Sequence, residues 1–247
     1  MKSLYLLTIK AVMIMKIKLL SLIALFAVSN SVSAQYYDSK NWKTEYHELG
    51  GGWGTVWAEY NPSVFKVDVS GADNQSATGI SLGYSQAFPL ITDGFLFLEA
   101  GLGAQYTFYS DDENQTIDGY KVKVEEDFSM WSLKLPVNLL YKFEIGNSGF
   151  SLSPFAGLTL RYNISAQIKA KASADGESYS EKYNLFKKSD MGGSDNTWNR
   201  FQVGWQAGLK AIISKSFMIS ASYGTDFTEI AEKTKLQTAT VSLGYCF

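Results

Sequence analysis

The stretch WSLKLPVNLLYKF, residues 131–143, decides the fold because apolar side chains alternate along it with side chains that are mostly small or polar. The apolar set comprises Trp131, Leu133, Leu135, Val137, Leu139, Tyr141 and Phe143. Successive side chains of a β-strand point to opposite faces, so this period of two predicts a strand. One face of the strand is apolar, and the other carries Ser132, Lys134, Pro136 and Asn138.

The same alternation recurs along most of the chain. It appears in residues 80–88, 96–108, 152–162, 201–213, 217–223 and 239–247. Residues 50–60 form a further candidate strand whose parity stays open, because Val56 and Tyr60 share one face while Trp53 and Trp57 share the other. The total is about eight strands, each near the roughly 9–11 residues that a tilted strand needs to cross a bilayer.

The composition of the two faces separates a membrane barrel from a soluble one. The apolar faces of the seven clear strands carry no Asp, Glu, Lys or Arg, and the other faces are mostly Gly, Ser, Thr, Ala and Gln. A lysine or arginine facing the bilayer midplane costs about 2–4 kcal/mol, and small side chains suit the lumen of a narrow barrel. A lipocalin-like barrel with an apolar interior is the alternative. We predict an all-β, closed, antiparallel, up-and-down transmembrane β-barrel with a filled lumen.

The connections support the membrane barrel because short and long ones alternate. The short turns are residues 89–94, 146–149 and 214–216, and the long segments are 61–75, 110–126, 165–196 and 228–235. Short periplasmic turns and long external loops are typical of outer-membrane barrels. Asp118-Gly119 and Asp175-Gly176 within the long segments predict hairpin turns, so the strands should continue outward as external ribbons.

The first residues have the pattern of an export signal. Lys16 and Lys18 precede an apolar run over residues 19–28, and small residues lead to Ala34. We therefore expect a signal peptide over residues 1–34, a short periplasmic segment over 35–45 and the barrel domain over 46–247.

Composition excludes several function classes. One Cys and one His rule out a disulfide framework and the common Cys/His zinc sites, and a net charge of −2 offers no basic surface for nucleic acid. We expect no cofactor and no metal. The acidic run Asp111-Asp112-Glu113-Asn114 has oxygen ligands that calcium uses, but it lacks EF-hand spacing and is predicted to be a solvated loop tip.

The chain resembles the small outer-membrane β-barrel domain family of Gram-negative bacteria, with the architecture of OmpA- and OmpX-type barrels. The resemblance covers residues 46–247. It rests on the residue pattern of the strands at 132–138 and 154–158 and on the last strand, 241–247, with its terminal aromatic residue. No motif singles out a PorT-like member. The resemblance implies an outer-membrane location, lipid as the surrounding partner, and an assembly signal read by the barrel assembly machinery: Val241, Leu243, Tyr245 and Phe247.

Five charged residues share the lumen-facing parity: Glu99, Lys134, Arg161, Lys210 and Asp226. An unpaired buried charge is costly, so we predict an ion-pair network in which Arg161 and Lys134 meet Asp226 or Glu99. A role in ion conduction or gating is the alternative.

Three function classes follow from this fold. A monomeric structural or adhesin-like barrel, binding an external partner through its loops, is the leading interpretation. A lipid-modifying enzyme is the second, but the sole histidine, His47, lies at the periplasmic start of the barrel, so we expect no enzymatic activity. A small-solute channel is the third.

Aromatic residues near the strand ends predict interfacial girdles: Phe88, Tyr141, Phe143, Phe217 and Tyr245 on the periplasmic side, and Tyr106, Phe108, Trp131 and Phe201 on the external side.

Overall fold

The computed structural model describes residues 52–69, 72–91, 95–117, 120–146, 149–174, 177–190 and 198–247. The expected signal peptide, the segment 35–45 and His47 lie outside these residues, so those predictions stay predictions. None of the described residues belongs to a helix that is long and apolar enough to cross a membrane.

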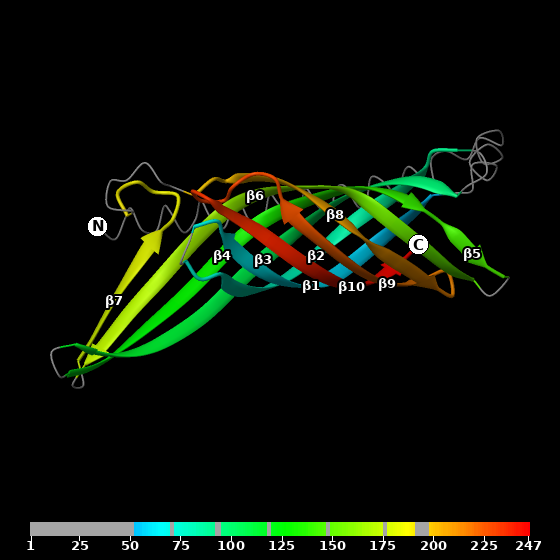
Figure 1. Ribbon diagram of the computed structural model, residues 1–247. Coiled ribbons are helices and arrows are strands. Elements are labelled where there is room, and N and C mark those ends of the chain that lie inside the picture. Colours follow the sequence, from blue (N-terminus) through cyan, green and yellow to red (C-terminus); the bar gives the residue numbers. More distant parts are fainter. Residues whose placement is uncertain are drawn as a thin grey trace, which may run out of the picture. The chain divides into compact units, whose positions relative to one another are not determined.

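Eight antiparallel strands form a closed hydrogen-bonded ring (Figure 1). In ring order they are β1 (Trp53–Val67), β2 (Gln75–Pro89), β3 (Leu96–Ile117), β4 (Tyr120–Tyr141), β6 (Phe150–Ala174), β8 (Phe201–Ile213), β9 (Phe217–Asp226) and β10 (Thr234–Cys246). The pairing of β1 with β10 closes the ring. The strand β5 (Phe143–Ile145) continues the line of β4, and β7 (Glu177–Asn184) pairs with β6. The all-β, up-and-down prediction is confirmed.

The structure settles the parity of the first strand. Trp57 is buried in the lumen, whereas Val56 and Tyr60 are about half exposed on the outside. The indole of Trp57 lies against two glycines of neighbouring strands: a Cβ atom at Gly83 or at Gly103 would come within 2.3 Å of its ring. Glycine at these two positions is therefore what allows a tryptophan to fit inside so narrow a barrel.

The outside of the ring is the apolar surface that the alternation predicts. Large side chains such as Leu82, Leu243 and Leu158 are exposed there, as are the aromatic residues expected in the girdles, except Tyr106, which is half-buried. Rings within each girdle touch: Tyr106 and Trp131 have centroids 4.8 Å apart, and Tyr141 and Phe143 4.6 Å apart.

Three ring strands extend far past the others, and with β7 they form an external sheet of four strands, β3–β4–β6–β7 (Figure 1). Pairing of β2 with β3 ends at Phe108, but β3 and β4 stay paired as far as Ile117 and Tyr120, and β6 and β7 as far as Ala174 and Glu177. The predicted ribbons are thus confirmed, although the Asp-Gly turns themselves lie outside the described residues.

This extension corrects two expectations. Much of the segments 110–126 and 165–196 is strand, and the acidic run 111–114 lies in β3 instead of at a loop tip. These segments form strands because each one is hydrogen-bonded to a neighbouring strand along its length: Asp111 pairs with Glu126, and Glu126 pairs with Ala170. The segment 61–75 is likewise mostly strand, because β1 continues to Val67 and β2 begins at Gln75.

A β-bulge separates the barrel part of β6 from its external part. Trp131 pairs with Ser165 and Ser132 with Asn163, so Ile164 is the extra residue. An extra residue shifts the alternation by one position. Odd-numbered residues such as Arg161 and Asn163 face the lumen before the bulge, and even-numbered residues such as Ala166 face inward after it.

Candidate functional site

Three ion pairs cross the middle of the lumen. Lys134 Nζ lies 2.8 Å from Glu59 Oε2, Arg161 Nη1 lies 3.0 Å from Asp226 Oδ2, and Lys210 pairs with Glu99. All six side chains are almost fully buried. Each pair joins strands that are not neighbours in the ring: β4 with β1, β6 with β9, and β8 with β3. The pairs therefore link non-adjacent strands across the interior of the barrel.

The partner of Lys134 differs from the predicted one. The sequence pattern assigned Lys134 to Asp226 or Glu99, whereas the structure places it beside Glu59. Glu59 was missed because the parity of its strand was open. A signal was nevertheless present: the predicted set had three cations but two carboxylates, and burial in a lumen favours a balanced set.

Polar side chains complete the ion pairs and fill the space between them. Ser81 Oγ donates to Glu59 (3.0 Å), and Asn138 Nδ2 donates to Glu99 (3.2 Å). Gln206 Nε2 in turn donates to Asn138 Oδ1 (2.7 Å). Because buried carboxylates need several donors to replace water, this network accounts for the Ser, Asn and Gln residues of the lumen face.

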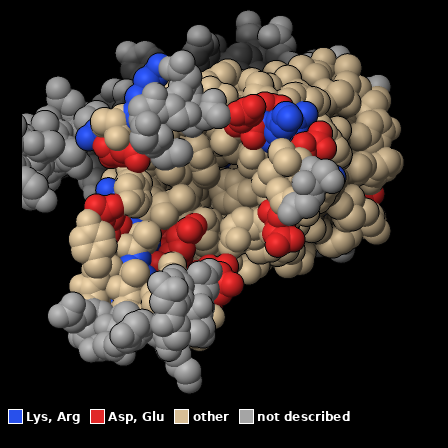
Figure 2. Space-filling model, turned by 60° about the vertical axis from the view of Figure 1, so that its left-hand side comes forward, with Lys and Arg blue, Asp and Glu red and all other residues tan. Residues whose placement is uncertain are grey.

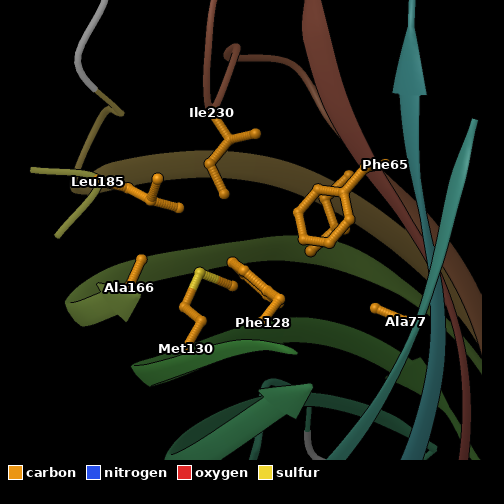
Figure 3. Close-up of a cluster of buried hydrophobic side chains, with 8 residues drawn as sticks. Phe65, Ala77, Phe128, Met130, Ala166, Leu185 and Ile230 are labelled. Atoms are coloured by element: carbon orange, nitrogen blue, oxygen red, sulfur yellow. The ribbon is translucent and has the colours of Figure 1, made fainter. Parts of the chain in front are cut away.

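The external end of the lumen is closed by an apolar plug (Figure 3). Its members come from five ring strands and from two loop segments: Phe65, Ala77, Phe128, Met130, Ala166, Leu185, Ile230 and Leu236. Tyr109, Ile168, Phe186 and Trp198 pack against it. Backbone hydrogen bonds hold the loops in place, from Leu185 N to Ala166 O (3.1 Å) and from Asn199 N to Ile230 O (2.7 Å).

The opposite end of the lumen, which is expected to face the periplasm, is only partly filled, and a cavity of about 470 Å³ lies there beside Trp53, Ile212 and Cys246. One cluster joins Trp57, Ile212, Met218 and Cys246, and another joins Ala87, Phe97, Leu140 and Phe155. The Cys246 thiol is buried in the lumen at 3.4 Å from Thr55 Oγ1.

Between these ends, the cavities that lie among the ion pairs are small. One of about 20 Å³ lies beside Lys134, Arg161 and Asp226, and another of about 30 Å³ lies beside Glu59, Glu99 and Lys210. Each has room for little more than a single water, which needs about 10–15 Å³. The middle of the described lumen is therefore packed with side chains.

The four residues of the predicted assembly signal lie on the outside of β10 and just beyond it. The side chains of all four, Val241, Leu243, Tyr245 and Phe247, are at least half exposed, and Phe247 is 64% exposed. Two backbone hydrogen bonds of 2.9 Å tie Phe247 to Gly54, so the last residue is fixed to the first strand of the ring.

The sequence profile of the outer membrane protein beta-barrel domain family matches residues 20–247. The chain belongs to this family. It is an outer-membrane β-barrel protein, and its location is the cell outer membrane. The match includes the whole of the predicted barrel domain.

Several solved structures of outer-membrane proteins are similar to this barrel. Ail, the attachment invasion locus protein of Yersinia pestis, has a TM-score of 0.41 at 19% identity, covering 79% of this chain and 99% of Ail. Neisserial surface protein A has a TM-score of 0.36 at 15% identity, and the match covers 78% of this chain and 95% of that protein. The outer membrane enzyme PagL has a TM-score of 0.36 at 12% identity, and the match covers 75% of this chain and 97% of PagL. No curated protein sequence matches the chain.

Proposed function

We propose that this outer-membrane barrel is a closed, monomeric support that presents the external sheet β3–β4–β6–β7 to a partner outside the cell. The observation that supports this most strongly is the continuation of paired strands beyond the barrel, because a sheet of this length adds nothing to the closure of the ring. Its position outside the bilayer follows from the outward side chains, which change from Phe108 and Trp131 to Ser110, Asp127 and Lys169.

The external sheet has a strand edge that no described strand covers. The strand β7 pairs with β6 on one side, and its other edge has no partner strand among the described residues. A row of unpaired backbone N–H and C=O groups is a template for an added strand, the mode called β-augmentation. An adhesin-like role by edge pairing is therefore the function that this geometry favours.

The two other function classes have less support. A channel needs an open path, whereas the described lumen has an apolar plug above three ion pairs. A lipid-modifying enzyme needs an activated nucleophile or base, and its sole candidate histidine, His47, lies outside the described residues. A role without catalysis is part of this proposal.

The test compares the full chain with a variant whose external sheet is trimmed. Residues 113–124 and 171–180 are each replaced by Asn-Gly, a two-residue hairpin turn, which keeps the pairs Asp112–Glu125 and Ala170–Glu181 as the last rows. Cells displaying equal amounts of each protein are scored for adhesion to host cells and to other bacteria. We expect adhesion from the full chain and its loss in the trimmed variant.

Two controls accompany this measurement. Both proteins should show heat-modifiable gel migration, which reports a folded barrel, and neither should conduct in a planar bilayer. Equal adhesion by both proteins, or channel currents from the full chain, would contradict the proposal.

A further inference from the structure

The two faces of the external sheet differ in charge. Cross-strand pairs place side chains of the four strands in rows, and alternate rows share a face. The inner face continues the surface of the apolar plug and comprises Tyr109, Asp111, Glu113, Val124, Glu126, Phe128, Ile168, Ala170, Ala172, Tyr179, Glu181 and Tyr183. The outer face comprises Ser110, Asp112, Asn114, Lys123, Glu125, Asp127, Lys169, Lys171, Ser173, Ser178, Ser180 and Lys182.

The outer face is balanced by its own ion pairs. It carries three carboxylates and four lysines. Lys123 Nζ lies 2.8 Å from Glu125 and 3.3 Å from Asp112, and Lys171 Nζ lies 3.1 Å from Glu125. This face therefore has the character of an ordinary solvated surface.

The inner face has four carboxylates and no basic residue among the rows that the structure describes. Three of them stand in a single row, Asp111–Glu126–Ala170–Glu181, and Asp111 is directly opposite Glu126. Like charges directly opposite each other on two strands are destabilising, so this row is unfavourable until a cation joins it.

Tyrosine hydroxyls, not cations, hold two of these carboxylates. Tyr109 Oη donates to Glu126 at 2.6 Å, and the hydroxyls of Tyr179 and Tyr183 both donate to Glu181. The bonds from the two tyrosines lower the pKa of Glu181, so its carboxyl is ionised at neutral pH. Figure 2 shows this end of the molecule as a hollow with a largely uncharged floor, with acidic side chains and some basic ones around its rim.

Ala170 leaves space between two carboxylates. It is paired with Glu126 on one side and with Glu181 on the other, and its methyl group is too short to fill the row between them. A strand added at the free edge of β7 would place one side chain opposite Glu181 on this same face. A long cationic side chain there reaches over Glu181 toward the gap above Ala170, beside the aromatic faces of Tyr179 and Tyr183.

We propose that the inner face of the external sheet, with the free edge of β7, is a docking site for an extended polypeptide segment that carries lysine or arginine at alternate positions. The inference rests on the proposed function and adds the chemistry of the partner. Backbone pairing with β7 selects an extended chain, and the carboxylate row selects cationic side chains on the inward side.

The test uses the full chain refolded into phosphatidylcholine vesicles, whose headgroups have no net charge. The probe is a short fluorescein-labelled peptide of alternating threonine and lysine, and its binding is followed by fluorescence anisotropy. The test variant is Asp111→Asn/Glu126→Gln/Glu181→Gln, and the matched control is Asp112→Asn/Glu125→Gln/Asp127→Asn on the outer face. Each of the two variants removes three carboxylate charges from the external sheet. Heat-modifiable migration confirms that each barrel is folded.

We expect the dissociation constant of the peptide to rise about tenfold in the inner-face variant and to change little in the outer-face control, because each exposed pair contributes modestly and three are lost. Alternating threonine and glutamate should not bind, and N-methylation of the peptide backbone along one edge should abolish binding. Equal weakening by the two variants, or undiminished binding of the N-methylated peptide, would overturn the inference.

A polyamine or a second copy of the chain are the competing occupants. Displacement of the peptide by spermine at equal molar charge, or binding of the chain to itself with the same inner-face dependence, would also overturn the proposal. The two proposals fail separately: wild-type adhesion by the inner-face variant, with loss of adhesion on trimming, would refute the cationic partner and leave the adhesin-like role intact.

Discussion

At the scale of single residues, the interior depends on charges that are matched one to one. Glu59, Glu99 and Asp226 face Lys134, Lys210 and Arg161 across the lumen. Transfer of a charge out of water is costly, and a buried pair recovers that cost only when geometry and extra donors are good. The serine and asparagine donors around the carboxylates supply those extra bonds.

The Glu59–Lys134 pair gives a first prediction. Glu59→Gln leaves Lys134 as an uncompensated buried cation, so we expect the free energy of unfolding to fall by about 3–5 kcal/mol. The double variant Glu59→Gln/Lys134→Met should recover most of that loss, because no buried charge remains. Urea unfolding in vesicles, followed by tryptophan fluorescence, measures both.

The control for this cycle is Glu144→Gln. Glu144 pairs with Lys142 at 2.8 Å, but its side chain is 72% exposed, so we expect a change below about 1 kcal/mol. A single variant of Glu59 that is as stable as the wild type would show that Lys134 has another partner in solution.

At the scale of elements, the outer face of the external sheet carries charged side chains that bridge neighbouring strands. Glu125 stands between Lys123 and Lys171, and hydrogen bonds from both lysines lower its pKa from 4.5 to about 2. A carboxyl whose pKa is depressed on folding stabilises the fold at pH values above its ordinary pKa. That contribution is lost as the pH falls through the folded value.

We therefore expect the Glu125 carboxyl to titrate near pH 2 in carbon-13 NMR spectra of the labelled protein, and its midpoint to move toward 4.5 in Lys171→Met. Lys169→Met is the matched control, because Lys169 lies on the same face but pairs with Asp127 in the next row. A midpoint near 4.5 in the wild type would mean that the ladder does not form in solution.

At the scale of the whole molecule, the protein is a barrel that is filled at its middle and plugged at one end. Its outside is apolar, and its last strand closes the ring. The terminal residue, Phe247, is tied to Gly54 through backbone hydrogen bonds, while its ring stays exposed on the outside. The ring stacks on that of Tyr84, with centroids 6.1 Å apart, and most of its surface stays uncovered by the described residues. We propose that the exposed ring of Phe247 is recognised during assembly.

The corresponding prediction concerns Phe247→Ala. We expect a several-fold drop in the amount of folded protein in the outer-membrane fraction, measured by heat-modifiable migration, but unchanged refolding into detergent. Phe201→Ala removes a similarly exposed aromatic ring from β8 and should leave assembly in cells unchanged. Equal assembly of Phe247→Ala and the wild type would remove Phe247 from the assembly signal.

The bulge at Ile164 and the parity of β1 show where sequence patterns stop being informative. Both Val56/Tyr60 and Trp53/Trp57 are apolar sets, so either could have faced the membrane. A single extra residue in β6 reverses every side chain beyond it, and no composition signal marks the position. The face taken by Glu181, on the strand that pairs with β6 beyond the bulge, therefore could not be read from the chain alone.

The sequence by itself determined the number of ring strands, their lipid-facing sides and five of the six lumen charges, because alternation along a strand is a local property. The tertiary structure alone decided that Glu59 is the sixth charge, that Leu185 and Ile230 close the external mouth, and that Asp111, Glu126 and Glu181 share a row. These three features join residues far apart in the chain, and their partners are set by strand register and ring closure, which depend on all the strands at once.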